Sequence, residues 1–248
     1  MNQLEVVTHA DSEQLLGDVL RAFLALAKQA IDDRGVCRVA LSGGSTPRRL
    51  YEALAHSDLD WSRLRLFWGD ERNVPQDDAQ SNYRMVAETL LRPAGVPPQS
   101  VFPVPVDVAQ PAAAAHRYEA TLRQQFGQSP TGPGDGAPGD ASLPHWDLVL
   151  LGLGDDVHTA SLFPQTRALQ VRDRWFVENW VEKFSTYRYT LTAPAINSGR
   201  QIWFLVSGQS KREALGKLLD RSVEDPHRYP AQLIRPTGVF ATADAFPN

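Results

Sequence analysis

The stretch DLVLLGLGDDVHTASLFP, residues 147–164, decides the fold of this chain. It opens on an apolar run, residues 148–152, of the kind that forms a central parallel strand covered on both faces. The run breaks at two glycines and continues through two aspartates to His158. In open α/β sheets, ligands bind just beyond the carboxyl ends of the strands. The stretch therefore places His158 at the edge of the sheet where a ligand would bind.

His158 follows Asp156 with one residue between them. An imidazole is the side chain best suited to moving a proton near neutral pH, and a neighbouring carboxylate fixes its tautomer and orientation. The alternative is that Asp156 caps a helix and His158 is a solvated loop residue. The pair alone favours that alternative, and two further stretches of the chain reverse the preference.

The composition is that of an ordinary globular protein, with 248 residues, 42% hydrophobic and 22% charged. A net charge of −4 provides no global attraction to nucleic acid or an anionic membrane, so any anion site must be local. The single cysteine, Cys37, argues against a disulfide framework and fits a reducing compartment. We find no signal-peptide pattern and no apolar run of membrane-spanning length, so we expect a cytoplasmic protein.

Apolar patterns along the chain predict alternating strands and helices. The expected strands cover residues 37–41, 64–68, 101–106, 148–152, 175–181, 187–192, 201–206 and 238–242. The expected helices include one from Asp11 or Ser12 to Gly35, one from about residue 81 or 82, and one over 109–126. This alternation predicts an α/β fold with a mostly parallel sheet and helices on both faces. The Gly/Pro-rich segment 128–144 is expected to be a mobile surface loop within a single domain spanning 1–248.

The stretch SGGSTP, residues 42–47, joins an expected strand to a helix N-terminus. Thr46 as the cap and Pro47 as the first helical residue predict the start of that helix. Glycines let the backbone approach a ligand, and the free amides of the first turn point at it. A phosphate would fit there, with the neighbouring hydroxyls as further donors. Such a turn alone is equally compatible with a simple connection.

Two other strand ends carry cations. In GDER, residues 69–72, Arg72 is expected to face the same cleft, where its planar guanidinium suits a carbonyl or phosphoryl oxygen. The alternative is a solvated loop with a surface salt bridge of little energetic value. SGQSK, residues 207–211, repeats the order of strand, glycine turn and helix, with Lys211 able to reach back over the helix N-terminus. The alternative for Lys211 is a solvated helical residue.

Together, SGGSTP (42–47), GDERNVPQDDAQSNY (69–83), GLGDDVHTASLFP (152–164), RYTLT (188–192) and SGQSK (207–211) resemble the 6-phosphogluconolactonases of the glucosamine-6-phosphate isomerase-like superfamily. Five segments in the family's order are far more specific than any one of them. The resemblance implies a Rossmann-like α/β fold and hydrolysis of 6-phospho-D-glucono-1,5-lactone to 6-phospho-D-gluconate in the oxidative pentose phosphate pathway. It also implies a cytoplasmic hydrolase without metal or organic cofactor. Its expected partner is a small sugar-phosphate lactone, with no nucleic acid or membrane, and we expect a monomer or weak dimer.

The resemblance also implies roles for individual residues. His158 takes the catalytic position, Asp156 the position that orients it, and Arg72 that of the substrate-facing arginine. The residues expected to hold the phosphate are Gly43, Gly44, Ser45 and Thr46, with Arg188 and Lys211 as cationic partners. The family motif is Asp-Gly-His, whereas this chain has Val157 in the middle. A glycine there indicates a positive φ or a close approach of the ligand, either of which a β-branched residue tolerates poorly.

Two other functions remain open. A sugar-phosphate isomerase or deaminase of the same superfamily would need an acidic residue shortly after the histidine, and TASLFPQT, residues 159–166, has none. A non-catalytic sugar-phosphate-binding protein would keep the phosphate site and lose the chemistry. The retained Asp156 and His158 argue against a non-catalytic protein. Val157, in place of the family's glycine, keeps that alternative open.

Overall fold

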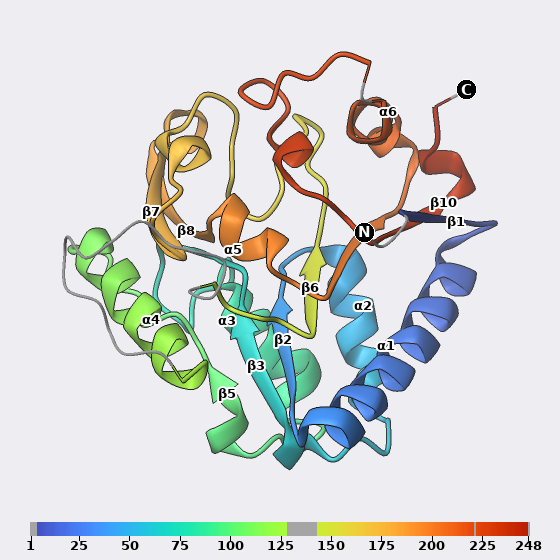
Figure 1. The fold of residues 1–248 in the computed structure, drawn as a ribbon, viewed down its shortest axis with the longest axis vertical. Coiled ribbons are helices and arrows are strands. Elements are labelled where there is room, and N and C mark those ends of the chain that lie inside the picture. The colour runs from blue at the N-terminus through green and yellow to red at the C-terminus, as the bar shows by residue number, and fades with distance from the viewer. Residues whose placement is uncertain (1–3, 128–142, 221, 248) are drawn as a thin grey trace.

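The computed structural model describes residues 4–127, 143–220 and 222–247 (Figure 1). Across these residues, seven parallel strands form one sheet in the order β1-β10-β9-β6-β2-β3-β5. The strands are β1 (Glu5–His9), β2 (Cys37–Leu41), β3 (Leu64–Trp68), β5 (Val101–Phe102), β6 (Leu148–Leu151), β9 (Gln201–Val206) and β10 (Gly238–Thr242). All four residues of β6 are buried, as expected for a central strand covered on both faces. The Gly/Pro-rich segment 128–144 lies, except for its last two residues, outside the described residues.

Helices connect most of these strands. They are α1 (Ser12–Arg34), α2 (Ser45–Leu54), α3 (Asn82–Val86), α4 (Pro111–Gln125), α5 (Ala193–Asn197) and α6 (Arg212–Leu219). A π-helical turn covers Ala87–Leu91, and 3-10 turns cover Trp61–Arg63, Pro98–Ser100, Arg167–Gln170, Glu182–Phe184, Gln209–Lys211, Pro230–Leu233 and Ala243–Ala245. The predicted ends of α1 are confirmed, since Asp11 caps it and Gly35 ends it at φ 75°. Within the described ranges, none of the helices combines the length and apolar character that a membrane span needs.

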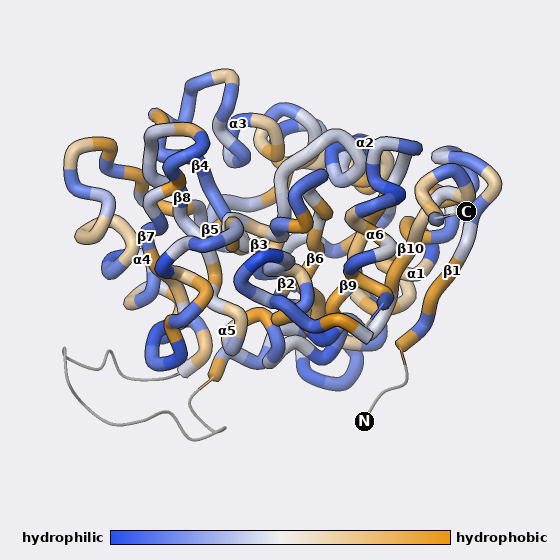
Figure 2. Tube along the Cα trace, turned by 90° about the horizontal axis from the view of Figure 1, so that it is seen from above, coloured by the Kyte–Doolittle hydropathy of each residue, from blue (hydrophilic) through white to orange (hydrophobic). Residues whose placement is uncertain are grey.

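The side of the sheet on which the chain adds its next strand changes between β2 and β6, while all strands of this sheet stay parallel. From β2 the chain passes through α2 to β3 on one side, whereas β9, the next strand of this sheet after β6, lies on the other side. Because strand crossovers are right-handed, this change of side puts the connecting helices on opposite faces. Figure 2 shows α2 and α5 on opposite sides of the row of strands. The predicted mostly parallel α/β fold is confirmed, and the crevice at the β2–β6 switch is where ligands of such sheets bind.

A second, antiparallel sheet of the described chain has the order β4-β8-β7. It comprises β4 (Asp70–Arg72), β7 (Phe176–Val181) and β8 (Thr186–Leu191). The sequence predicts β7 and β8 as strands, but not that they lie outside the main sheet or that β8 pairs with the charged residues after β3. The strand predicted over 101–106 is also shorter than expected, because the prolines at 103 and 105 have no N–H to donate to a ladder.

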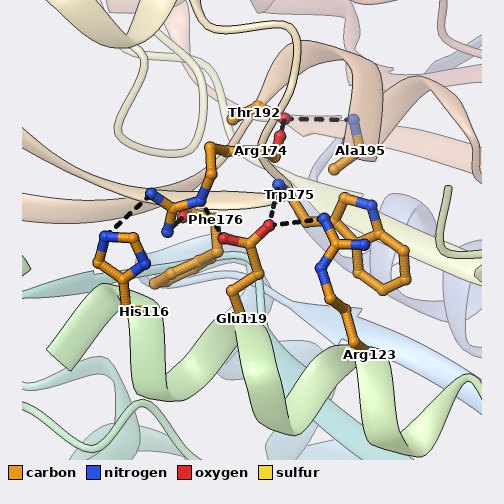
Figure 3. Close-up of polar contacts among 8 residues, drawn as sticks. All are labelled: His116, Glu119, Arg123, Arg174, Trp175, Phe176, Thr192 and Ala195. Carbon is orange, nitrogen blue, oxygen red and sulfur yellow. Dashed lines mark hydrogen bonds and ion pairs between the residues drawn. The ribbon is translucent and has the colours of Figure 1, made fainter. Parts of the chain in front are cut away.

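A buried carboxylate fixes α4 against the start of β7. Glu119, 5% exposed, accepts hydrogen bonds from Arg123 Nη2 at 3.0 Å and from the backbone N–H of Trp175 at 2.9 Å. Arg174 donates to its other oxygen, and the guanidinium of Arg123 lies 4.5 Å from the centroid of a Trp175 ring. Figure 3 shows the Glu119 carboxylate between the two arginines. These contacts tie the second sheet to the rest of the core.

We expect Glu119→Ala to lower the free energy of unfolding by about 3 kcal/mol, because it leaves Arg123 buried without its counter-charge. Urea denaturation followed by circular dichroism measures the change. The matched control is Glu52→Ala, which removes an exposed partner of Arg48 and is expected to cost no more than about 0.5 kcal/mol. Equal effects of the two substitutions would contradict the structural role of Glu119.

Candidate active site

A cavity of about 320 Å³ opens at the carboxyl ends of β2, β3, β6 and β9. Its lining contains six residues that the sequence predicted for the site: Gly43, Gly44, Arg72, His158, Arg188 and Lys211. They come from four strand ends and from β8, so residues distant in sequence meet at one opening. Asp156 does not line this cavity and instead contacts His158 from behind.

Ser45 and Thr46 lie outside this cavity. Ser45 lines two neighbouring pockets, and Thr46 lines the smaller of these. The prediction that Thr46 caps the helix was wrong, because Gly44 is the N-cap and α2 begins at Ser45. Gly44 has φ 106°, a value that only glycine adopts readily, which lets the helix start earlier than the Thr-Pro signal indicated. The part of Ser45 and Thr46 in phosphate binding stays a prediction.

The centre of the site is the hydrogen-bonded pair of His158 and Asp156. Because a carboxylate only accepts, Nδ1 of His158 donates to Oδ1 of Asp156, and Nε2 is left with the lone pair. Among the described residues, Nε2 has no hydrogen-bond partner. The imidazole stacks on Phe163 with 4.1 Å between ring centroids. This arrangement presents a basic nitrogen in a fixed tautomer beside the cavity.

The carboxylate of Asp156 is held ionised. Partial burial by itself would raise its pKa, but the hydrogen bond from His158 and the ammonium of Lys183 hold the pKa of Asp156 well below its usual range. Nζ of Lys183 donates to Oδ2 at 3.0 Å. An ionised Asp156 favours the imidazolium that forms when His158 accepts a proton.

The turn between Gly154 and His158 sets the direction of the imidazole. The N–H of Gly154 donates to the carbonyl of His158 at 2.9 Å, and the N–H of Val157 donates to the carbonyl of Gly154 at 3.0 Å. Val157 has φ 61°, so the turn adopts the left-handed conformation that a glycine at this position indicates. Its side chain is only 3% exposed, and burial with the core holds the β-branched residue in that conformation.

Positive charge collects in the lining of the cavity, at Arg72, Arg188 and Lys211. Arg72 of β4 lies directly opposite Arg188 of β8 in the antiparallel pair. Like charges opposite each other are unfavourable, and burial together with Arg72 lowers the pKa of Arg188. Nζ of Lys211 donates to Asp155 at 2.6 Å at the cavity's edge. A bound anion would relieve the repulsion between the two arginines.

Two polar residues of the cavity lining, Asp70 and Ser161, were not among the predicted site residues. Asp70, 7% exposed, accepts a hydrogen bond from the hydroxyl of Ser161 at 2.9 Å. Ser42, whose hydroxyl was predicted as a further phosphate donor, also lines the cavity, and that buried hydroxyl lacks a partner among the described residues. Asp70 could have been found, because residues two apart in a strand share a face and Arg72 was already placed toward the cleft. Among the described residues, no cluster of three or more His, Cys, Asp or Glu is arranged to hold a metal ion.

Comparison with known proteins agrees with this geometry. The family model described as glucosamine-6-phosphate isomerases/6-phosphogluconolactonase matches residues 10–242. The chain belongs to this family. A 6-phosphogluconolactonase of Synechocystis sp. is 44% identical over 210 residues, 85% of this chain and 82% of that protein. One of Nostoc sp. is 40% identical over 228 residues, 92% of this chain and 90% of that protein.

Solved structures of the glucosamine-6-phosphate isomerase/6-phosphogluconolactonase family have the same fold. The crystal structure of 6-phosphogluconolactonase from Leishmania guyanensis has a TM-score of 0.82 at 27% identity, covering 98% of this chain and 97% of that one. The predicted family is therefore confirmed. Val157, at φ 61°, has the left-handed conformation that a glycine at this position would favour.

Proposed function

We propose that this chain hydrolyses 6-phospho-D-glucono-1,5-lactone to 6-phospho-D-gluconate, the second step of the oxidative pentose phosphate pathway. The named relatives, 40–44% identical over most of the chain, support this substrate. The observation that carries the chemistry is the His158–Asp156 pair, whose Nε2 has no partner among the described residues and lies beside a cavity that Arg72, Arg188 and Lys211 also line. A lactone is an activated ester, so a base, a water and stabilisation of charge are sufficient.

In the proposed mechanism, Nε2 of His158 accepts a proton from water as the water oxygen bonds to C1 of the lactone. Asp156 stabilises the resulting imidazolium. Arg72 stabilises the negative charge that develops on the carbonyl oxygen. The bond between C1 and the ring oxygen then breaks, and the imidazolium returns its proton to that oxygen. The products are a carboxylic acid and a hydroxyl, with no covalent enzyme intermediate.

We assign the phosphate end of the substrate to two of the cations that line the cavity. Arg188 and Lys211 would contact its oxygens, together with the backbone around Gly43 and Gly44, where α2 begins without a side-chain cap. Binding a remote group in this way holds the reacting carbon in register with His158. The site thus uses Arg188 and Lys211 for binding, and His158 together with the neighbouring Arg72 for chemistry.

We expect Arg188→Ala to lower kcat/KM for the phosphorylated lactone by about 100-fold, because it removes a charge-assisted contact worth roughly 2–3 kcal/mol. Hydrolysis of unphosphorylated D-glucono-1,5-lactone by the same variant is expected to change little. The matched control is Arg63→Ala, which alters an exposed arginine far from the cavity. Equal losses on both lactones would contradict the phosphate role of Arg188.

The same purified protein is assayed for the two alternative functions, a sugar-phosphate isomerase or deaminase and a non-catalytic sugar-phosphate-binding protein. Asp70 supplies the cavity with a carboxylate that residues 159–166 lack, so an isomerase or deaminase assay is informative. Release of ammonia from glucosamine 6-phosphate would favour a deaminase. Binding of 6-phosphogluconate without hydrolysis of the lactone would favour a non-catalytic sugar-phosphate-binding protein.

We also propose that residues 1–248 act as one domain, as a monomer or weak dimer in the cytoplasm. Among the described residues, one cluster of buried apolar side chains includes residues from both halves of the chain, which supports one domain. Cys37 is a buried free thiol whose pKa burial raises to about 12, which makes it unreactive and suits a reducing compartment. Light scattering and cell fractionation measure assembly and location.

A further inference from the structure

We infer that Lys183, at the tip of the β7–β8 hairpin, is a positioning residue that completes a three-membered relay with Asp156 and His158. The inference rests on the proposed function and deepens it by adding a residue from a different part of the chain. Asp156 and Lys183 lie 27 positions apart in sequence.

The carboxylate of Asp156 is held from both sides. Its Oδ1 accepts from the imidazole of His158, and its Oδ2 accepts from Nζ of Lys183 at 3.0 Å. The side chain of Asp156 is 26% exposed, so solvent reaches the carboxylate only in part. With one partner on each oxygen, the carboxylate cannot rotate freely away from the imidazole. Lys183 therefore restrains the group that orients His158.

The turn that carries Lys183 is held in place by its own contacts. Ser185 ends the turn at φ 47°, and its N–H donates to the carbonyl of Glu182 at 3.0 Å. Nε1 of Trp180, at the base of the turn, donates to the carboxylate of Glu182 at 2.8 Å. These contacts hold the backbone of Lys183 in place, although its side chain is 62% exposed.

The residue after Lys183 reaches the same catalytic pair through aromatic contacts. Phe184 packs edge-on against Phe163 with 5.6 Å between ring centroids, and Phe163 stacks on the imidazole of His158. The guanidinium of Arg188 lies 5.2 Å from the centroid of the Phe184 ring. The hairpin tip is thereby seated against the active site, and Lys183 is not a lone surface lysine that happens to meet a carboxylate.

The charge of Lys183 has a predictable effect on the pH dependence. Charged groups that face His158 are Asp156 and Lys183 behind it and Asp70, Arg72, Arg188 and Lys211 around the cavity. Loss of Lys183 removes one cation and leaves the negative charge of Asp156 less compensated. The protonated imidazole is then favoured. As the pH is lowered, the imidazole therefore loses the basic form needed for catalysis at a higher pH than in the wild type. Because Lys183 is largely exposed, solvent screens much of this effect.

The test is Lys183→Met, which keeps the length of the side chain and removes its charge. We expect the acid limb of the kcat/KM profile to move upward by about 0.5 pH unit. We also expect kcat to fall about threefold to tenfold with KM unchanged, because Lys183 does not line the cavity. Lys183→Arg should restore both values. Lys28→Met, on an exposed face of α1, is the control and should behave as the wild type.

An NMR titration of the His158 ring in substrate-free protein gives a readout that does not depend on turnover. An upward shift of the same size in Lys183→Met would support the inference. An unchanged or lowered midpoint would overturn it, even if kcat fell. A wild-type protein that fails to hydrolyse the lactone would instead overturn the proposed function, so the two failures are distinguishable.

Discussion

His158→Ala is expected to lower turnover of 6-phospho-D-glucono-1,5-lactone by about 10²–10⁴-fold, the contribution of one well-placed acid–base group. His158→Asn should lose a similar factor, because an amide can hold a water but does not accept its proton. KM should change little, since the phosphate contacts remain. Initial rates of acid release, corrected for spontaneous hydrolysis, measure the loss.

The control for this substitution is His56→Asn, which changes an exposed histidine at the end of α2. It should keep wild-type turnover. Circular dichroism checks that the His158 variants are folded. Full turnover by either folded His158 variant would show that another group activates the water, and the assigned role would be wrong.

Gly154→Ala is expected to lower kcat by about 100-fold although it adds only one methyl group. A Cβ at this position would lie 1.9 Å from Nδ1 of His158, which is far inside van der Waals contact. The imidazole must therefore move, and it is held by a short turn. A displacement of about 1 Å from a productive geometry is sufficient for a loss of this size. Single-turnover kinetics measure the chemical step.

The matched control is Gly152→Ala, two residues earlier in the same stretch. A Cβ at Gly152 meets no atom within 4 Å, so we expect a much smaller loss. Neither glycine has a positive φ, so the backbone tolerates alanine at both positions. Comparable losses in the two variants would show that the stretch needs glycine for a reason other than the placement of His158.

The strands of the main sheet were largely predictable from the sequence. The predicted ranges 37–41, 64–68, 201–206 and 238–242 coincide with β2, β3, β9 and β10. Each is a mostly apolar run bounded by glycine or polar residues, because strands of a parallel sheet are buried on both faces. Local composition therefore contains most of the information that defines them.

The partners of the second sheet were not predictable in the same way. β4 consists of three charged residues and has no apolar pattern, and it is a strand only because β8 pairs with it. That pairing sets Arg72 opposite Arg188, which are 116 positions apart in the chain. A single sequence shows no local signal for such a contact.

The site was predictable where its residues lie in the segments that follow strands of the main sheet. Gly43, Arg72 and His158 lie in the segments that follow β2, β3 and β6, and the carboxyl ends of parallel strands meet at one edge. The contacts of Asp70 with Ser161 and of Lys183 with Asp156 span 91 and 27 positions. Neither could be read from spacing, because each depends on how the second sheet packs over the first.

The most direct test of the central claim is the rate of 6-phospho-D-glucono-1,5-lactone hydrolysis by the purified wild-type protein, measured against the spontaneous rate at the same pH. We predict a large acceleration, with 6-phospho-D-gluconate as the product and no added metal or cofactor required. A rate equal to the spontaneous one, in a folded protein that still binds 6-phosphogluconate, would contradict the claim that His158 activates water in this cavity.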